Sequence, residues 1–360
     1  MRFPEFTEEW VNVSLKDVAD FQKERISSGL LDESTYISTE NILQNFQGVQ
    51  SAISIPANTN VVAYKKNDIL LSNIRPYLKK AWFSDRIGGC SADVFVLRSK
   101  TCEPEFLYNV IASDKFINYV MSGAKGVKMP RGDKNQMESF SFSIPAVVEQ
   151  RKISRLFQLL DERIVTQNKI IEDLKKLKSA ISERLLKGVK GSTVLLSDIC
   201  DIVKGKQING ENLSESGNYY VMNGGTELSG YYDDYNVEAN TISISEGGNS
   251  CGYVQFNTSP FWSGGHCYSI QDITDNVDNL YLYHYLKSKE DAIMKLRIGS
   301  GLPNIQKKDL AMFKIKIPAV EQQLKISIFL SSLERKAEIE ERIQNALLKE
   351  KQYLLHQMFI

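Results

Sequence analysis

The sequence predicts an α+β fold in which two similar globular units of mixed α/β structure are separated by two long helices. Three observations lead to this prediction: an internal repeat, a seven-residue hydrophobic periodicity in each copy, and short β-rich segments outside it. The chain has 360 residues, which is more than one average domain needs. An apolar content of 42% and a charged content of 24% are typical of a folded protein with real hydrophobic cores.

The internal repeat is the strongest of these signals. Residues 126–163 match residues 299–336 without gaps, at an offset of 173 positions and with 13 identities in 38 pairs. The phrase Ile-Pro-Ala-Val occurs in both copies, and a weaker match of 15–20 with 196–201 opens each half. Because there are only two copies, the pattern indicates a duplication and not a solenoid.

Each copy contains a segment whose hydrophobic residues recur every three or four positions. Over more than four heptads this is the pattern of a coiled-coil helix, and a helix over 149–187 would be about 58 Å long at 1.5 Å per residue. Polar residues interrupt the stripe at Gln167 and Lys178, and at Glu340 and Lys351 in the second copy. Since one apolar stripe is unstable in water, we expect the two helices to pack on each other. The apolar members of the stripes are Ile153, Phe157, Leu160, Ile164, Ile171, Leu174, Ile181 and Leu185, then Ile326, Leu330, Leu333, Leu347 and Leu354.

The globular units contain short β-rich segments joined by glycine-rich connections, which favour a compact and highly curved sheet. One short helix is expected before each repeated turn, over 105–121 and over 279–296. The predicted strands are 61–64, 69–71, 94–97 and 140–144 in the first unit, and 241–244, 253–256 and 313–317 in the second.

The net charge of the chain is zero, which by itself gives no sign of a nucleic-acid partner. The charge is uneven, however: residues 62–135 contain 13 Lys and Arg against 7 Asp and Glu, and residues 198–313 contain 8 against 15. Any contact with a nucleic acid in the second region must therefore come from local groups of basic side chains.

The sequence shows no pattern of a secreted, membrane-bound or catalytic chain. Residues 1–10 lack a secretory pattern, the apolar runs are too short to cross a bilayer, and five cysteines without paired spacing favour a reduced, cytoplasmic protein. Cys251, His266 and Cys267 lack the paired spacing of zinc ligands, so no metal site is predicted. Phosphate-binding, dinucleotide-binding and amino-methyltransferase motifs are not found, which leaves no candidate catalytic residue.

Four phrases follow one another along the chain: Trp10 with Leu15–Ala19, Asp68–Ser72, Gly299–Ile305, and Pro318–Gln323 with its copy Pro145–Gln150. Together they resemble the type I restriction–modification specificity subunits. The resemblance extends over essentially the whole chain and occurs twice. The first repeated turn keeps Pro130 but lacks the Gly-x-Pro-x-Ile form of the second, which leaves its loop geometry open.

The resemblance implies a non-catalytic reader of a bipartite, asymmetric site in double-stranded DNA. Each globular unit would be a target-recognition domain, and the helices would form an antiparallel coiled coil that sets the gap and docks two modification subunits. Restriction subunits could join them. Methyl transfer and cleavage, with S-adenosylmethionine, ATP and Mg²⁺, would belong to those partners, and this chain would hold no cofactor. The implied segments are 1–145 and 191–318 for the recognition domains, and 146–190 and 319–360 for the helices.

Side chains that can read base edges or bind phosphates cluster near the repeated turns and two other loops. Trp82 is expected in the core. The alternative is a coiled-coil scaffold that binds only protein; a self-contained methyltransferase or nuclease would require a cofactor or metal motif. The DNA-binding candidates are Arg75, Tyr77, Lys79, Lys80, Lys125, Lys128, Arg131, Lys134, Lys204, Lys206, Gln207, Asn249, Arg297, Asn304, Lys307 and Lys308. The candidates for docking modification subunits are Gln150, Ile153, Phe157, Leu160, Gln323, Ile326, Leu330 and Leu333.

Overall fold

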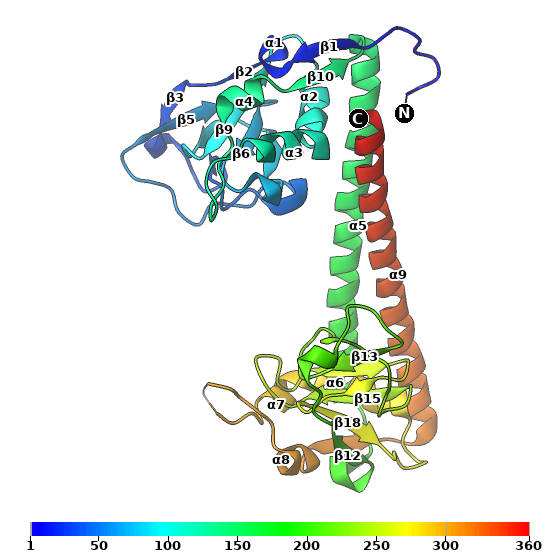
Figure 1. Ribbon diagram of the computed structural model, residues 1–360. Helices are drawn as coiled ribbons and strands as arrows, with labels where there is room; N and C mark the ends of the chain where they lie inside the picture. Colours follow the sequence, from blue (N-terminus) through cyan, green and yellow to red (C-terminus); the bar gives the residue numbers. More distant parts are fainter. Residues whose placement is uncertain (1, 300, 360) are drawn as a thin grey trace. The chain divides into compact units, whose positions relative to one another are not determined.

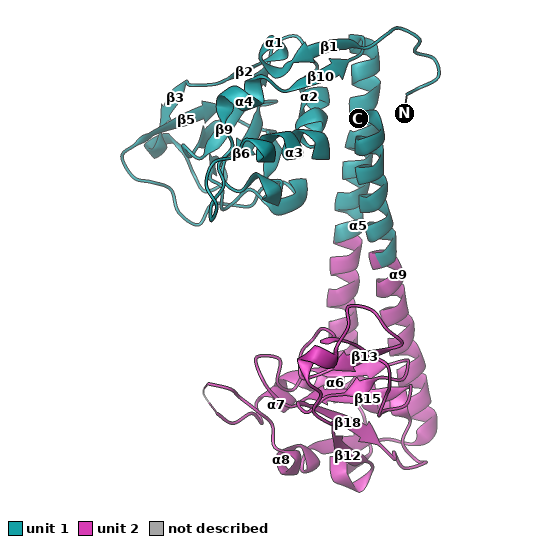
Figure 2. Cartoon of the chain, in the orientation of Figure 1, with its two compact units in different colours: residues 1–168, 342–360 teal, residues 169–341 magenta. Residues whose placement is uncertain are grey.

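The computed structural model describes residues 2–299 and 301–359 (Figure 1). By its contacts the chain forms two compact units, Met1–Asn168 with Arg342–Ile360 as unit 1, and Lys169–Glu341 as unit 2 (Figure 2). The division falls inside the two long helices, α5 (Val147–Lys187) and α9 (Val320–Met358). Each unit therefore contains one globular part and a portion of both helices.

The described residues of unit 1 form ten strands in three small sheets, where one curved sheet was expected. The strand orders are β1-β10, β2-β9-β6-β7 and β3-β5-β8-β4, with only the β4–β8 pair parallel. The prediction of a single sheet was wrong because strands of two to six residues end at frequent turns. The strands are β1 (Val11–Ser14), β2 (Ala19–Phe21), β3 (Arg25–Ser27), β4 (Tyr36–Ile37), β5 (Asn60–Tyr64), β6 (Ile69–Ser72), β7 (Ala81–Phe83), β8 (Gly88–Cys90), β9 (Val94–Ser99) and β10 (Ser141–Ile144).

The helix expected over 105–121 is two helices in the structure. Ser113 interrupts it, because its side chain accepts a hydrogen bond from the Phe116 N–H and so caps a second helix. The helices of the globular part of unit 1 are α1 (Leu15–Val18), α2 (Pro104–Ile111), α3 (Asp114–Ser122) and α4 (Lys134–Glu138), with short 3-10 turns η1 (Ser28–Leu30), η2 (Gln44–Phe46) and η3 (Pro76–Leu78).

Unit 2 has the same kinds of element, again in three sheets. Their orders are β11-β19, β12-β18-β15-β16 and β14-β13-β17. The helix expected over 279–296 is also divided, into α6 and α7. The elements are β11 (Ser192–Leu195), η4 (Leu196–Asp198), β12 (Asp201–Lys204), η5 (Gly210–Asn212), β13 (Tyr219–Met222), β14 (Gly230–Tyr232), β15 (Thr241–Ser245), β16 (Val254–Asn257), β17 (Trp262–Ser263), β18 (Cys267–Gln271), α6 (Asn279–Ser288), α7 (Glu290–Met294), α8 (Lys307–Ala311) and β19 (Lys314–Ile317).

The offset of 173 residues extends into strands where the sequence shows little identity. In unit 1, Ile69 of β6 lies opposite Leu97 of β9 and Phe83 of β7. In unit 2, Ile242 of β15 lies opposite Ile270 and Phe256, each of them 173 positions later than its counterpart. The duplication therefore preserves the register of the central sheet as well as the turn and the helix.

Within each unit, α5 and α9 pack antiparallel. In unit 1 the Lys351 ammonium binds the Asp161 carboxylate, and the Gln344 amide, seven residues earlier, binds Asn168, seven residues later. In unit 2 the Lys178 ammonium binds the Glu334 carboxylate. Asp161 and Glu334 are 173 positions apart, as are Lys178 and Lys351, so the two ion pairs are copies of each other.

The hydrophobic stripes of the long helices lie in the cores. Unit 1 packs Ile153 and Phe157 of α5 with Met358 and Phe359 from the other end of the chain. Unit 2 packs the start of α9 with Leu186 of α5. At that end of α5 Leu186 is buried, whereas Leu185, the residue expected in the apolar stripe, is exposed. No helix among the described residues is long and apolar enough to span a membrane.

Candidate nucleic-acid interface

The first repeated turn is a short hairpin fixed to the end of β6. The Lys125 N–H donates to the Arg131 carbonyl at 3.0 Å, and the Arg131 N–H donates to the Lys125 carbonyl at 2.9 Å. The Arg75 N–H donates to the Pro130 carbonyl at 2.7 Å, and the Gly132 N–H to the Asn73 carbonyl at 2.8 Å. The structure therefore brings together two basic clusters that are about fifty residues apart in the sequence.

The second turn repeats these bonds one by one. Ile298 and Asn304 exchange two backbone hydrogen bonds of 2.8 and 3.0 Å. The Gly248 N–H donates to the Pro303 carbonyl at 3.0 Å, and the Ile305 N–H donates to the Glu246 carbonyl at 2.8 Å. Every donor and acceptor is 173 positions from its counterpart in unit 1. Ser300, within this turn, lies outside the described residues.

The two turns share a backbone conformation although their sequences differ. Gly126 has a φ of 98° and Gly299 a φ of 95°, which are values that L side chains rarely adopt. Each glycine is followed four residues later by a proline, Pro130 or Pro303. In the described residues, the backbone hydrogen bonds and the glycine conformation of the loop are therefore the same in both units.

Two of the basic residues at the first turn are tied to aspartates. Lys125 binds Asp133 at 2.9 Å and Arg131 binds Asp93 at 2.7 Å. The bond from Lys125 lowers the pKa of Asp133 below its usual value, so this carboxylate stays charged. Lys134 lies over the Phe21 ring at 5.1 Å and also faces Glu138.

Arg75 and Lys128 are both exposed, and neither forms an ion pair with any part of the chain that the structure describes. Arg75 has a φ of 49°, a left-handed conformation. These two are the cations of the first turn whose charge is available to a ligand.

Three other candidates in unit 1 are placed differently. Lys79 binds Asp114, and the Lys80 ammonium donates to the Thr39 carbonyl, so both side chains are engaged within the fold. Tyr77, in η3, is 48% exposed and remains available to a ligand.

In unit 2 a buried carboxylate lies behind the turn. Glu246 is 6% exposed and accepts hydrogen bonds from the Lys204 ammonium at 2.7 Å and the Tyr268 hydroxyl at 3.0 Å. Burial raises the pKa of Tyr268, so its hydroxyl stays protonated. The exposed His266 ring lies 3.8 Å from the second Glu246 oxygen. The sequence did not point to Glu246, because a single acidic residue after a β-rich segment forms no motif.

The other candidates of unit 2 are exposed. Asn249 follows the Gly248 that binds the turn, and Arg297 precedes the turn. Lys206 and Gln207 lie after β12, where the Trp262 indole N–H donates to the Lys206 carbonyl. Completing this set, Asn304 closes the turn, and Lys307 and Lys308 begin α8.

The residues expected to dock modification subunits are not on the surface. The structure places them between the helices and the globular parts, so as side chains they stabilise the fold. This burial corrects the expectation of a binding surface made by these groups, since a partner could reach them only by opening the core. Gln150, Ile153, Phe157, Gln323, Ile326 and Leu330 are each between 0 and 7% exposed, and Leu160 and Leu333 are half-buried against the same cores.

The two glutamines form equivalent clamps at the start of the long helices. The Gln150 amide donates to the Pro145 carbonyl at 2.8 Å and accepts from the Glu103 N–H at 2.9 Å. The Gln323 amide donates to the Pro318 carbonyl at 2.9 Å and accepts from the Asp278 N–H at 2.8 Å. The repeated glutamine therefore joins each long helix to its globular part.

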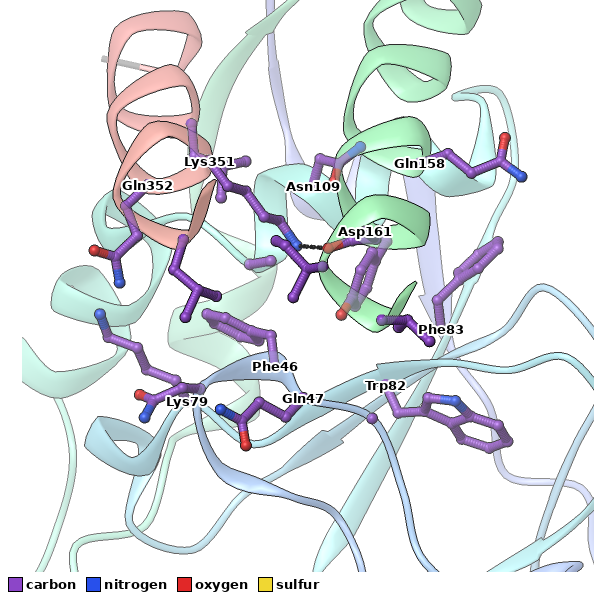
Figure 3. Close-up of a pocket in the computed structure, with 18 of the residues that line it drawn as sticks. Phe46, Gln47, Lys79, Trp82, Phe83, Asn109, Gln158, Asp161, Lys351 and Gln352 are labelled. Atoms are coloured by element: carbon purple, nitrogen blue, oxygen red, sulfur yellow. Dashed lines mark hydrogen bonds and ion pairs between the residues drawn. The ribbon is translucent and has the colours of Figure 1, made fainter. Parts of the chain in front are cut away.

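Unit 1 also contains a cavity of about 670 Å³ between its globular part and its portions of α5 and α9 (Figure 3). Phe46, Lys79 and Trp82 line one side, and Asp161 and Lys351, joined by their ion pair, line the other. Trp82 is 7% exposed and packs edge-on against Tyr64, as expected for a core residue. The cavity is distinct from the turn.

These features define a duplicated α+β protein that repeats one turn and one helix clamp. One family model, described as the type I restriction modification DNA specificity domain, matches residues 7–176 and again 189–349. Since the matched residues cover most of the chain, the chain belongs to this family.

Two relatives illustrate the range of sequence similarity. The chain is 24% identical over 402 aligned positions to the type I restriction enzyme MjaVIII specificity subunit of Methanocaldococcus jannaschii. The alignment covers 97% of this chain and 92% of that protein. A Mycoplasma pneumoniae protein named as a type I specificity subunit is 31% identical over 145 residues, or 40% of this chain. That match spans 38% of the length of the M. pneumoniae protein.

Solved structures share the fold. The crystal structure of a type I restriction–modification S subunit from M. genitalium aligns with a TM-score of 0.70 and 17% identity, covering 98% of this chain and 96% of that one. A second structure, from work on complex assembly and conformational transition of the type I restriction–modification system, aligns with a TM-score of 0.62 and 19% identity, over 97% of both chains.

Proposed function

We propose that this chain is the DNA-specificity subunit of a type I restriction–modification complex and that each unit reads one half of a bipartite, asymmetric site. The observation that carries the proposal is the repeated turn. The same hydrogen bonds hold it in both units, while its side chains differ between them. Two turns that share a backbone geometry but carry different side chains could each bind a half-site of different sequence.

Charge supports DNA as the ligand of these turns. Lys128 lies within the first turn and Arg75 beside it, and Arg297, Lys307 and Lys308 flank the second, all exposed. Exposed Arg and Lys neutralise phosphates and release counterions, and this gives affinity without sequence preference. Specificity would then come from polar side chains such as Asn249 and Asn304, which can bond to base edges.

The reaction chemistry is proposed to belong to partner chains. Modification subunits, two in number, would supply methyl transfer with S-adenosylmethionine, and restriction subunits, where present, would use ATP and Mg²⁺. This chain would contribute no catalytic residue and hold no cofactor. A DNA-reading role would place it in the cytoplasm.

The docking surface for modification subunits is proposed on the outward faces of α5 and α9, since the inward faces are buried. Exposed apolar residues occur there, among them Leu159 at 47% and Ile328 at 68% exposed. Charge reversal on the outward faces near 149–163 and 321–336 should prevent assembly. A complex that assembles normally with those changes would contradict the docking proposal.

The central experiment is selection from randomised duplexes, using this chain co-purified with its modification subunit. Two short enriched blocks at one fixed spacing are expected if each unit reads a half-site. One block, or no enrichment, would contradict the proposal and favour a coiled-coil scaffold that binds only protein.

A second experiment tests the electrostatic contact on the selected duplex. Lys128→Ala should weaken binding and lower the slope of log affinity against log salt by about 1. Lys66→Ala is the matched control, because Lys66 is exposed and lies before the opposite end of β6. Equal slopes for the two variants would argue against phosphate contact at Lys128.

A further inference from the structure

We propose that the tips of the two repeated turns are apolar wedges that press between neighbouring base pairs of DNA. The residues are Val127 and Met129 in unit 1 and Leu302 in unit 2. The inference rests on the proposed DNA-reading function and adds to it a distortion of the duplex, produced at each half-site by an apolar side chain.

The first argument is exposure. Val127 is fully exposed, Met129 is 47% exposed and Leu302 is 87% exposed. None of the three belongs to a hydrophobic cluster of the described residues. Exposure of these apolar side chains to water is unfavourable, and insertion between stacked bases would remove them from water.

The second argument is repetition. Met129 and Leu302 are 173 positions apart, so an apolar side chain occupies the same tip position in both units. The sequences around it have changed: Lys128 corresponds to Gly301, and Arg131 to Asn304. What both tips retain is an exposed apolar group, while the polar groups that could read bases differ.

The third argument is rigidity, since a wedge must hold its shape while it separates two base pairs. Paired backbone hydrogen bonds close each turn, and a further bond to the Pro130 or Pro303 carbonyl joins it to the sheet. The left-handed glycines at Gly126 and Gly299 bend the backbone without strain at those positions. The tips are therefore held before any ligand arrives.

The fourth argument is charge, which favours DNA over a protein as the occupant. Lys128 lies at the first tip and Arg75 beside it, both exposed and unpaired within the described ranges. Arg297 and Lys307 flank the second turn in the same way. Architectural proteins that bend DNA combine phosphate-binding cations with inserted Leu, Met or Ile side chains, and kink the duplex by roughly 20–90°.

The test uses the full chain with its modification subunit and the duplex obtained by selection. Val127→Ser and Leu302→Ser should each bind at least ten-fold more weakly and bend the duplex less, as measured by energy transfer between end labels. Ile53→Ser is the matched control, because Ile53 is 90% exposed in a different loop of unit 1. It should bind and bend like the wild type.

Two further readouts separate a wedge from other roles. The serine variants should keep the wild-type salt slope, because they remove no charge, and an abasic site placed at the wedged step should restore much of their lost affinity.

Serine variants that bind and bend the selected duplex as the wild type does would overturn the wedge while leaving the proposed function intact. Loss of the modification subunit from the Val127→Ser complex, but not from the Ile53→Ser complex, would assign the tip to a protein contact and also overturn it. A wild-type complex that enriches no duplex would remove the proposed function itself.

Discussion

Asn73 and Glu246 occupy the same position in the two units. The backbone carbonyl of each accepts a hydrogen bond of 2.8 Å from the residue after the turn, the Gly132 N–H in one unit and the Ile305 N–H in the other. Both side chains are buried, at 9% and 6% exposure. The Asn73 side chain is an amide and the Glu246 side chain a carboxylate. The same backbone hydrogen bond is therefore made beside a different side-chain group in each unit.

This difference predicts unequal costs of truncation. Glu246→Ala should destabilise the chain by about 2–3 kcal/mol, because it removes hydrogen bonds to Lys204 and Tyr268; the contribution of Lys204 is reduced by its exposure. Asn73→Ala should cost less than about 1 kcal/mol, since the Asn73 side-chain oxygen has no hydrogen-bond partner among the described residues. Urea unfolding of the two variants measures both values, and equal losses would contradict the prediction.

The glutamine clamps should contribute measurably to stability. Gln150→Ala and Gln323→Ala each remove three hydrogen bonds and leave a backbone N–H unpaired, so each should cost about 2–4 kcal/mol in urea unfolding. Gln322→Ala is the control, because this neighbouring glutamine is exposed. Because alanine is a better helix former than glutamine, Gln322→Ala should cost nothing, and a loss there as large as that at Gln323 would contradict the clamp.

Stability should fall as the solution is acidified below neutral pH, because of His284. Burial lowers its pKa from 6.5 to about 4, and its ring nitrogen lies 2.9 Å from the Ser331 hydroxyl. The unfolded chain takes up the proton first, so the contribution is complete above pH 6.5 and is lost as the pH falls toward 4. Between pH 8 and pH 5 this loss is about 2 kcal/mol.

The pH effect can be assigned by replacing His284. His284→Asn should lose stability at pH 8 but show a smaller decrease between pH 8 and pH 5 than the wild type. The difference between the two decreases measures the histidine, since the other titrating groups are common to both chains. An identical pH dependence would mean that His284 is not responsible.

The left-handed glycine of the first turn should resist substitution. Gly126→Ala places a methyl group at a φ of 98° and 3.2 Å from the Met129 carbonyl oxygen, at a cost of about 1–2 kcal/mol. Because the turn supports the proposed DNA contact, affinity for the selected duplex should fall as well. Gly29→Ala, whose nearest contact is 3.6 Å away and whose φ is ordinary, is the control and should change neither quantity.

The sequence predicted the long helices well, because periodicity and identity record them directly, but it predicted seven of the nineteen strands that the described residues form. The helix expected over 149–187 is found over Val147–Lys187, and all seven expected strands are present within one or two residues. At the offset of 173 the repeat was visible in the sequence only from residue 126 onward, although a weaker match of 15–20 with 196–201 opens each half. Its earlier part, in β6 and β15, keeps its register through hydrophobic character and not through identity, so counting identical residues could not find it.

Side-chain environments could not be read from residue type alone. Lys79 and Lys80 resemble phosphate ligands in the sequence, yet each is engaged within the fold. Ile153 and Phe157 lie on the expected apolar stripe, but the stripe faces the globular part as well as the other helix, which buries residues assigned to a partner surface. Periodicity shows that a face is apolar and does not show what covers it.

The way α9 completes unit 1 has a consequence for biosynthesis. Phe359 packs against Phe106 at 5.5 Å and against Phe157 at 6.3 Å, between ring centres. A ribosome makes residues 1–168 first but delivers this ring only after all of unit 2 has been translated. The first half of the chain would thus be the last to close its core, and until then its exposed aromatic surface would be the part of the nascent chain most in need of a chaperone.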